Sequence, residues 1–356
     1  MVGLTYNYNR TDDYNIDYIT LQENNTGNYL FFGDNYYGLT YLIDELDYTG
    51  KVDLVYIDPP YNTGNTFKMG NTMSKNKDTN VAYVDKMPLD TYLGFMSERL
   101  KLIHKLLSNK GSFYLHCDYK VGHYLKVLCD TIFGSGNFRA DITRVKCNSK
   151  NFKQRNYGNI KDCILFYTKS SDYIWNYPRI PFTDEDINRL YNKVDDKGDR
   201  YYTVSLNAPG EVSDGDTGKA WRGRLPPKGR HWCTNQSVLD EWDKNGLIEW
   251  SRTGNPRKKI YAKDKIKEGK VLQDIWEFKD PPRVEYPTTK SKELLEVIIK
   301  ASSNRDSIVC DCFCGSGSTC GVARSLGRKY VGMDSGGESV KLLKRDFGDS
   351  TWIEII

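Results

Sequence analysis

The sequence predicts an α/β protein whose core is a doubly wound, mostly parallel sheet. Short runs rich in valine, tyrosine and isoleucine alternate with longer segments in which apolar residues recur at helical spacing. This alternation occupies both ends of the chain, whereas residues 171–285 are rich in Gly, Pro and Asp and show no sustained period. Because strand–helix alternation builds parallel sheets covered by helices on both faces, we expect one sheet made from two separated segments, with an irregular, partly β region inserted between them.

The first segment of the predicted sheet begins with Val52–Ile57, an apolar-rich run that is typical of a buried strand. Apolar side chains at helical spacing then predict a helix, which Gly111 is expected to stop. The expected order after the first strand is a helix over 92–107, a strand over 112–116, a helix over 119–133 and a strand over 163–168.

The same alternation returns after the irregular region. Its expected order is a helix over 291–301, a strand over 307–311, a helix over 318–326 and a strand over 330–333. We therefore divide the chain into an N-terminal extension (1–28), a first half of the α/β domain (29–170), the inserted region (171–285) and a second half (286–356).

Composition limits the classes of protein to consider. The chain has 356 residues, of which 38% are hydrophobic, enough for one large domain or two ordinary ones. It contains no apolar run of about 18 residues, the length that a bilayer-spanning helix needs, and residues 1–10 show no secretory-signal pattern. A soluble, cytoplasmic protein with no membrane partner is expected. Nine cysteines without a Cys-x-x-Cys pair, and four scattered histidines, favour reduced thiols over a metal site.

Charge is unevenly distributed along the chain. The net charge is +4, yet residues 1–50 carry a balance of −7. Three later stretches, 139–170, 219–232 and 252–270, carry +6, +5 and +6. If they share a face they form a stripe that binds a polyanion such as DNA, because each neutralised phosphate releases a counterion. Separately solvated surfaces remain the alternative from charge alone.

A glycine-containing turn is predicted between the strand 307–311 and the helix that follows. Gly315 and Gly317, two residues apart, let the backbone approach a bound group closely at the carboxyl end of a strand. Asp334 lies at the tip of the next predicted strand, where a carboxylate can accept both hydroxyls of a ribose. The phosphate-binding Gly-Lys-Ser/Thr pattern is absent, as is the third glycine of a dinucleotide fingerprint. A simple turn remains the alternative for this motif alone.

A second motif, Asp58-Pro59-Pro60-Tyr61, follows the predicted buried strand 52–57. Two prolines remove two amide donors, so the carbonyls around them are left as acceptors beside the Asp58 carboxylate. The ring of Tyr61 follows. This combination suits a planar heterocycle that is held by its face while its exocyclic NH2 donates to acceptors. The alternative is a Pro-Pro turn with a buried tyrosine.

Together, Asp58–Tyr61 and Phe313–Gly317 resemble the motifs of the amino-methylating DNA methyltransferases, which use S-adenosylmethionine to methylate adenine N6 or cytosine N4. The catalytic tetrapeptide precedes the cofactor glycines, an order similar to that of the beta class. The run Asp58–Gly64 is similar to type III modification subunits and their solitary relatives, and the likeness extends from about residue 33 to 334. Cys312 departs from the pattern, since proline is usual at that position.

The resemblance implies a Rossmann-like methyltransferase sheet, an inserted target-recognition region and S-adenosylmethionine as the cofactor. It assigns catalysis to Asp58, Pro59, Pro60 and Tyr61. Around the cofactor it implies that Asp311 approaches the methionine amino group and that Asp334 takes the ribose. The other residues that it places at the cofactor are Phe313, Gly315 and Gly317 along its path, Asp34 at the adenine edge, and Thr288 and Lys290 at the methionine carboxylate. Exposed turns remain the alternative for Asp34, Thr288 and Lys290.

Sequence recognition is expected in the inserted region, where basic residues interleave with tryptophans, a pattern suited to phosphate contact and stacking. The candidate DNA contacts there are Arg222, Arg224, Lys228 and Arg230. The expected partners are double-stranded DNA, a second copy of the chain in a homodimer, and a restriction subunit.

Adenine N6 is favoured over cytosine N4 as the methylated atom, because Asp-Pro-Pro-Tyr resembles the adenine enzymes more often. Two hypotheses of other kinds stay open. One is an inactive cofactor- or DNA-binding subunit of a restriction-modification assembly, and the other is RNA methylation, which the lack of a recognisable RNA-binding module disfavours.

Overall fold

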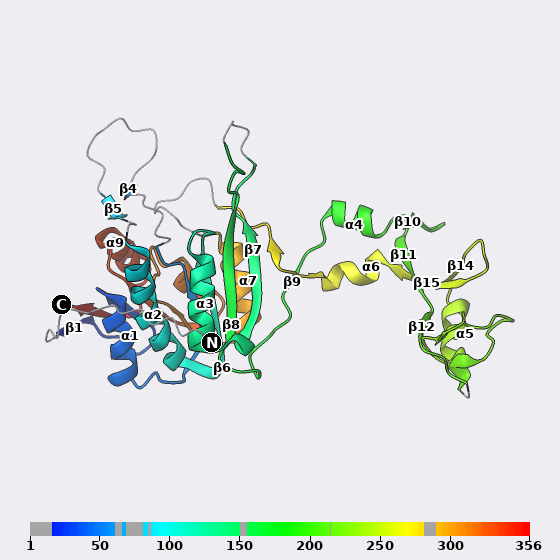
Figure 1. Ribbon diagram of the computed structural model, residues 1–356, viewed down its shortest axis with the longest axis horizontal. Helices are drawn as coiled ribbons and strands as arrows, with labels where there is room; N and C mark the ends of the chain where they lie inside the picture. The colour runs from blue at the N-terminus through cyan, green and yellow to red at the C-terminus, as the bar shows by residue number, and fades with distance from the viewer. Residues whose placement is uncertain are drawn as a thin grey trace. The chain divides into compact units, whose positions relative to one another are not determined.

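The computed structural model describes residues 16–60, 66–68, 81–84, 87–149, 155–213, 215–280 and 290–356. The chain divides into two compact units (Figure 1). Unit 1 comprises Met1–Pro178 and Gln273–Ile356, and unit 2 comprises Arg179–Leu272, which is inserted in the sequence of unit 1. The four-part division made from the sequence, with target recognition in its third part, stays a prediction.

Unit 1 is built on one ten-stranded sheet within the described residues. Its strands are β1 (Tyr18–Gln22), β2 (Tyr29–Phe32), β3 (Val52–Ile57), β6 (Leu107–Cys117), β7 (Phe138–Val145), β8 (Lys161–Thr168), β17 (Ile275–Trp276), β18 (Ile308–Asp311), β19 (Lys329–Asp334) and β20 (Thr351–Ile355). They lie in the order β1-β20-β2-β19-β18-β3-β6-β8-β7-β17. All neighbours from β20 to β6 are parallel, and β8 is antiparallel to both β6 and β7. The predicted α/β fold with a mostly parallel sheet is therefore confirmed.

Helices cover this sheet. They are α1 (Asn35–Asp44), α2 (Leu89–Leu106), α3 (Gly122–Phe133), α7 (Lys292–Ser302), α8 (Ser318–Ser325) and α9 (Gly337–Asp346). A 3-10 turn, η1 (Ser135–Asn137), follows α3, and β4 (Thr66–Lys68) pairs with β5 (Val81–Val84) outside the main sheet.

The two faces of β3 pack against different helices. Val55 and Ile57 belong to a fully buried core shared with α1, α2 and α3, which lie side by side in Figure 1. Tyr56 points to the opposite face because side chains alternate along a strand. On that face Tyr114 of β6 bonds Ser302 at the end of α7, 2.8 Å between the two hydroxyl oxygens, and α7 packs against β3.

The residue predicted to end the helix over 92–107 is wrong. The helix expected over 92–107 runs over Leu89–Leu106, but Gly111 does not stop it, because Leu107 already has extended backbone angles and starts β6. Gly111 instead lies within β6, where a Cβ would lie 2.9 Å from Leu107 Cδ2 and 3.0 Å from the Val52 carbonyl oxygen. Glycine is required at position 111 because the neighbouring backbone and side chains pack too closely to admit a Cβ.

Unit 2 has short strands and a small core. Its strands are β9 (Arg179–Ile180), β10 (Lys193–Val194), β11 (Arg200–Ser205), β12 (Asn207–Pro209), β13 (Arg230–Trp232), β14 (Ile248–Trp250), β15 (Pro256–Tyr261) and β16 (Lys270–Val271). The order β10-β11-β15-β14 forms an antiparallel sheet, while β12 pairs with β13 and β9 with β16. The helical segments are α4 (Asp184–Leu190), η2 (Asp216–Gly218), α5 (Gln236–Lys244), α6 (Ala262–Lys265) and η3 (Ile266–Glu268). The core consists of Leu206, Trp221, Trp232, Leu239 and Ile248.

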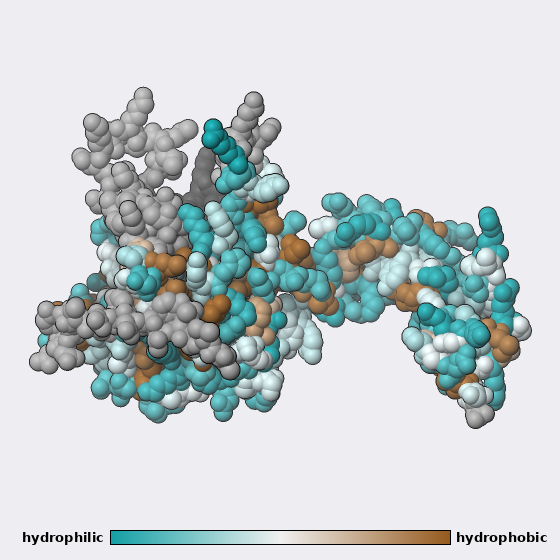
Figure 2. Space-filling view, viewed as in Figure 1, coloured by the Kyte–Doolittle hydropathy of each residue, from teal (hydrophilic) through white to brown (hydrophobic). Residues whose placement is uncertain are grey.

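The visible surface of each unit is mainly hydrophilic, with apolar side chains in small groups (Figure 2). None of the helices in the described part of the chain combines the length and apolar composition that crossing a bilayer requires.

Candidate active site

Three neighbouring strands of unit 1 carry a carboxylate at the same edge of the sheet. Asp58 directly follows β3, Asp311 ends β18, and Asp334 ends β19. These strands are parallel and adjacent, since β18 pairs with β3 on one side and β19 on the other. Two motifs that are far apart in the sequence therefore meet at the carboxyl edge of the sheet, where open α/β sheets place their ligands.

Asp58 forms an ion pair with Lys290. The distance from Lys290 Nζ to Asp58 Oδ2 is 2.5 Å, and the two side chains are only 10% and 16% exposed, respectively. Charges removed from water are tolerated when they are paired. The structure thus places Lys290, which the sequence assigned to the methionine carboxylate, beside the predicted catalytic carboxylate.

Asp311 is the most deeply buried of the three carboxylates, at 3% exposure. Its Oδ2 accepts a 2.6 Å hydrogen bond from Thr319 Oγ1, and its Oδ1 accepts one of 3.0 Å from the Phe313 amide. Burial raises the pKa of Asp311 to about 7 against these two bonds, and the charges of Asp58 and Asp334 add to the rise. The buried position of Asp311, with two further carboxylates nearby, therefore favours its protonated form.

Asp334 ties two loops together. Its Oδ2 accepts from the Gly315 amide at 2.9 Å, while its Oδ1 accepts from the Gly336 amide at 2.8 Å and from Ser339 Oγ at 2.5 Å. A carboxylate offers about four acceptor positions, and donors among the described residues occupy three of those of Asp334, which leaves one for a ligand hydroxyl.

The turn after β18 requires glycine at positions 315 and 317, because both residues have positive φ angles. Gly315 has φ 53° and Gly317 has φ 81°, both in the left-handed region that glycine enters freely. A Cβ on Gly317 would lie 2.6 Å from Leu343 Cδ2 and 2.7 Å from the ring of Phe347. Gly317 directly precedes α8, so this glycine lets the turn lie tightly against α9 and the residues that follow it.

Arg99 is a site residue that sequence reasoning missed. Its side chain is 3% exposed and its NH2 group pairs with Asp34 Oδ1 at 2.6 Å. Its Nε donates to Asn35 Oδ1 at 2.5 Å, and Asn35 Nδ2 donates to the Cys312 carbonyl at 2.6 Å. The guanidinium also lies 3.4 Å from the ring centroid of Phe95. Asp34 and the turn after β18 are thereby joined by one buried cation.

The remaining predicted residues are placed as follows. Tyr61 and Thr288 lie outside the described residues. The four candidate DNA contacts are exposed side chains in unit 2. Arg222 pairs with Asp243 at 2.6 Å, Arg224 donates to the Thr253 carbonyl at 3.2 Å, and Arg230 donates to Asn207 Oδ1 at 3.0 Å.

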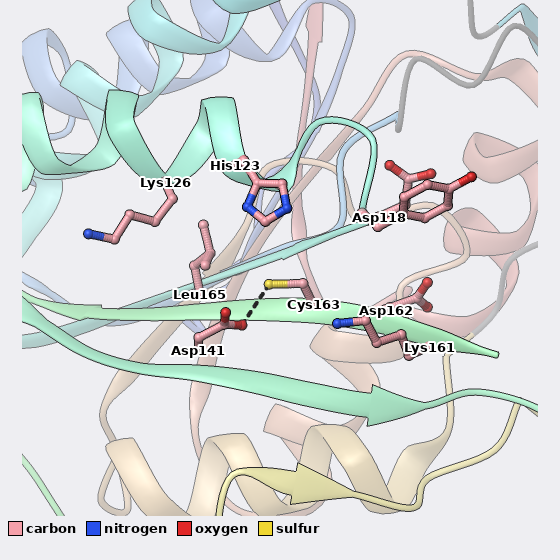
Figure 3. Close-up of a pocket in the computed structure, with 10 residues that line it drawn as sticks. Asp118, His123, Lys126, Asp141, Lys161, Asp162, Cys163 and Leu165 are labelled. Atoms are coloured by element: carbon pink, nitrogen blue, oxygen red, sulfur yellow. Dashed lines mark hydrogen bonds between the residues drawn. The ribbon is translucent and has the colours of Figure 1, made fainter. Parts of the chain in front are cut away.

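A separate polar hollow opens between α3 and the β7–β8 strands (Figure 3). Among the described residues, none that was predicted for the site lines it. Asp141 and Cys163 face each other there, with 2.9 Å between Sγ and Oδ1. Asp162 lies on its wall.

A family model named for N6 and N4 methylation and described as DNA methylase matches residues 52–345. The chain belongs to the DNA methylase family. The predicted resemblance to amino-methylating DNA methyltransferases is therefore confirmed.

Two curated relatives of this DNA methylase chain agree with the family assignment. Type II methyltransferase M.EcaI from Enterobacter cloacae is 41% identical over 303 residues, which cover 83% of this chain and 65% of the relative. The StyLTI Mod subunit of a type III restriction-modification enzyme from Salmonella typhimurium is 26% identical, with 89% of this chain and 53% of the relative covered. The chain thus spans between about half and two thirds of these two curated relatives. A solved M1.HpyAVI–SAM complex matches with TM-score 0.47 and 17% identity over 89% of this chain and 97% of that one.

Proposed function

We propose that this DNA methylase transfers a methyl group from S-adenosylmethionine to N6 of an adenine in double-stranded DNA. The observation that carries the proposal is the meeting of Asp58-Pro59-Pro60 with Asp311, Asp334 and the glycine turn at one edge of the sheet. Family membership and the type II and type III relatives support methylation of DNA, while the choice of adenine N6 over cytosine N4 rests on the Asp-Pro-Pro-Tyr motif.

The residues present fit S-adenosylmethionine. This molecule carries a positive sulfonium and a positive ammonium group, and the site offers three clustered carboxylates with one of them holding a raised pKa of about 7. Asp311 would receive the ammonium group and Asp334 a ribose hydroxyl, with Phe313, Gly315 and Gly317 along the path. When bound, the sulfonium supplies an activated methyl group and its leaving thioether.

Asp58 and the Pro59 carbonyl would orient the target amine. The lone pair of an adenine amino nitrogen is delocalised into the ring, so it is a poor nucleophile. Two acceptors that hold the N–H bonds out of the ring plane favour a more tetrahedral nitrogen whose lone pair faces the methyl group. Holding the two reacting atoms in line contributes on the order of 7–11 kcal/mol at best. The excess proton leaves the nitrogen only after the methyl group has moved, so Asp58 need not be a strong base.

The target adenine must leave the duplex to reach this edge of the sheet, at a cost of a few kcal/mol. Stacking on Tyr61 would recover about 1–3 kcal/mol. Unit 2 is the proposed recognition element, with the basic residues at 222, 224, 228 and 230 contacting DNA. A restriction subunit and a second copy of this chain are proposed partners.

Methyl transfer by the purified 356-residue chain tests the proposal. Labelled S-adenosylmethionine and duplex DNA are incubated with the wild type, and the nucleosides are identified by mass spectrometry. N6-methyladenine is the expected product, whereas N4-methylcytosine would overturn the choice of base. Transfer to RNA alone would overturn the choice of nucleic acid. An inactive purified chain would favour a subunit without activity of its own.

Two variants on the same strand segment separate catalysis from folding. Asp58→Asn is expected to lower the rate about 10²–10³-fold, the usual loss when one preorganised polar contact to the reacting group is removed, while cofactor binding persists in calorimetry. The matched control is Asp53→Asn at the start of β3, where the carboxylate accepts from Ser108 Oγ at 2.9 Å. Full activity of Asp58→Asn would contradict the assigned role.

A further inference from the structure

A row of buried polar side chains crosses the sheet next to Asp58. Tyr56 of β3 lies 2.9 Å from His116 of β6, measured between the hydroxyl oxygen and Nδ1. His116 Nε2 lies 3.2 Å from Oδ2 of Asp162 on β8. The three residues are between 0% and 3% exposed. Isolated polar groups at such depth are costly, so three in contact form a built arrangement. The row has no part in the chemistry proposed above.

Two cations, one on β7 and one directly after it, anchor the far end of the row. Lys146 Nζ lies 2.7 Å from Asp162 Oδ1, and Arg144 NH1 lies 3.4 Å from Oδ2. Arg144 is fully buried and also pairs with Asp280 at 2.5 Å and donates to the Phe278 carbonyl at 2.7 Å. Asp162 is therefore already neutralised without any charge on His116.

The near end of the row reaches the catalytic motif. β3 and β6 are parallel, and their last paired residues are Ile57 and Leu115. Asp58 directly follows β3, and His116 is the next residue of β6. The negative charge of Asp58 acts on both Tyr56 and His116, and the positive charge of Lys290 acts on His116.

The hydrogen bonds of His116 determine which of its two ring nitrogens carries the proton. Burial lowers the pKa of His116, against the opposing influence of Asp58 and Asp162. Burial opposes ionisation of Asp162 too, but hydrogen bonds from His116 and Lys146 outweigh it and hold the pKa of Asp162 well below its usual range. An ionised carboxylate only accepts, so His116 Nε2 carries the proton and donates it to Asp162. Nδ1 of the neutral ring is then the acceptor for the hydroxyl of Tyr56.

We propose that the row Tyr56–His116–Asp162 is a positioning device for Asp58, which keeps a neutral imidazole beside the catalytic carboxylate and fixes the end of β3. This inference rests on the proposed function. A protonated His116 would lose its bond from Tyr56. It would also place a second positive charge beside the Asp58–Lys290 pair and draw the carboxylate away from the target amine. His116 is therefore a positioning residue whose protonation switches methyl transfer off at low pH.

Several charged or titratable groups face His116 and set that switch. They are Tyr56 on β3, Asp58 directly after it, Asp162 on β8, Arg144 on β7, Lys146 directly after it, and Lys290 before α7. Only His116 among them has an ordinary pKa near 6.5. Asp311, whose pKa burial raises to about 7, adds an acid limb of its own through the cofactor site, so the part of the rate–pH profile that depends on Tyr56 is assigned to the His116 ring.

The test compares two tyrosines on the same face of neighbouring strands. Tyr56→Phe removes the hydroxyl that bonds His116. Tyr114→Phe, the matched control, removes an equally buried hydroxyl that bonds Ser302 instead. Single-turnover methyl transfer is measured against pH, and cofactor affinity is measured by calorimetry. In parallel, ¹⁵N-histidine NMR follows the imidazole nitrogens, since the chain has only four histidines.

Tyr56→Phe is expected to slow methyl transfer about tenfold, the loss typical when a group that orients a functional side chain is removed. The affinity for the cofactor should not change. Without its donor the neutral imidazole is less favoured, so the acid limb and the His116 titration should both move upward by about 0.7 pH unit, the equivalent of one hydrogen bond. Tyr114→Phe should leave both in place.

Identical pH profiles for the two variants would overturn the inference, as would an imidazole that carries both protons at the pH of full activity. These outcomes leave the proposed function intact, because the wild type would still transfer methyl groups. A wild type that transfers none would overturn the proposed function and the inference with it.

Discussion

Asp311→Asn measures how strongly burial disfavours the ionised carboxyl at the active site. The carboxyl of Asp311 is 3% exposed, and its pKa is raised from 3.8 to about 7, chiefly by burial. A folded-state pKa above the unfolded one means that the folded protein binds an extra proton between those two values. The stability contributed by this group is complete below pH 3.8 and is lost as the pH rises through 7.

The size of the effect follows from the shift. At 1.36 kcal/mol per pH unit, the whole window corresponds to about 4 kcal/mol, and the part between pH 5 and 8 to about 3 kcal/mol. Asn does not titrate, so Asp311→Asn lacks this loss. Any cost from its altered bonds to Thr319 and Phe313 is independent of pH and cancels when two pH values are compared.

Hydrogen exchange at the amides of β18 and β19 measures this change, because the slowest amides report unfolding of the unit that contains them. At matched pH, protection in Asp311→Asn relative to the wild type should increase about a hundredfold from pH 5 to pH 8. Asp172→Asn, at a carboxylate that is 81% exposed, should track the wild type. A constant ratio across that range for Asp311→Asn would refute the burial argument.

Two other perturbations probe the same site. Gly317→Ala should destabilise the protein by about 2–4 kcal/mol, because alanine resists φ 81° and its Cβ would lie 2.6 Å from Leu343 Cδ2. The control is Gly337→Ala, whose added Cβ meets no atom within 4 Å. Equal melting temperatures for the two variants would count against tight packing at the turn. Binding of S-adenosylmethionine at pH 7 should release about half a proton, because a cation lowers the pKa of Asp311 from about 7. Calorimetry in buffers of different ionisation enthalpy measures this release, and the same value in Asp311→Asn would exclude Asp311 as its source.

The strongly patterned elements were predictable from sequence, and the boundaries that were missed have local causes. The strand 52–57 is observed at those residues. The helix expected over 119–133 starts instead at Gly122, because Asp118 Oδ1 accepts from the amides of Lys120 and Val121 and forms a turn first. β7 was not predicted, since its arginine and aspartate side chains resemble those of an exposed segment. Its Arg144 is fully buried only because Asp162 and Asp280 lie opposite.

The candidate site was predictable where backbone chemistry is encoded locally. Prolines after a strand and glycines before a helix indicate acceptors and close approach whatever their neighbours are. Arg99 and His116 were missed because each depends on a partner that is distant in sequence. Arg99 sits in an amphipathic helix where arginine is ordinary, and only Asp34 and Asn35 reveal its role. His116 continues an apolar strand, and only the neighbouring strands show that it lies beside Asp58.

The pairing of β9 with β16 indicates where the chain could accept an exchanged segment. Arg179 and Ile180 pair with Val271 and Lys270. The inserted segment therefore begins and ends on two neighbouring strands, which lie about 4.8 Å apart. A segment inserted between these two paired strands needs to match only β9 and β16, because their pairing brings its two ends together whatever sequence lies between them. Grafting another sequence between residues 180 and 270 therefore changes one module and leaves the strand order of the other untouched.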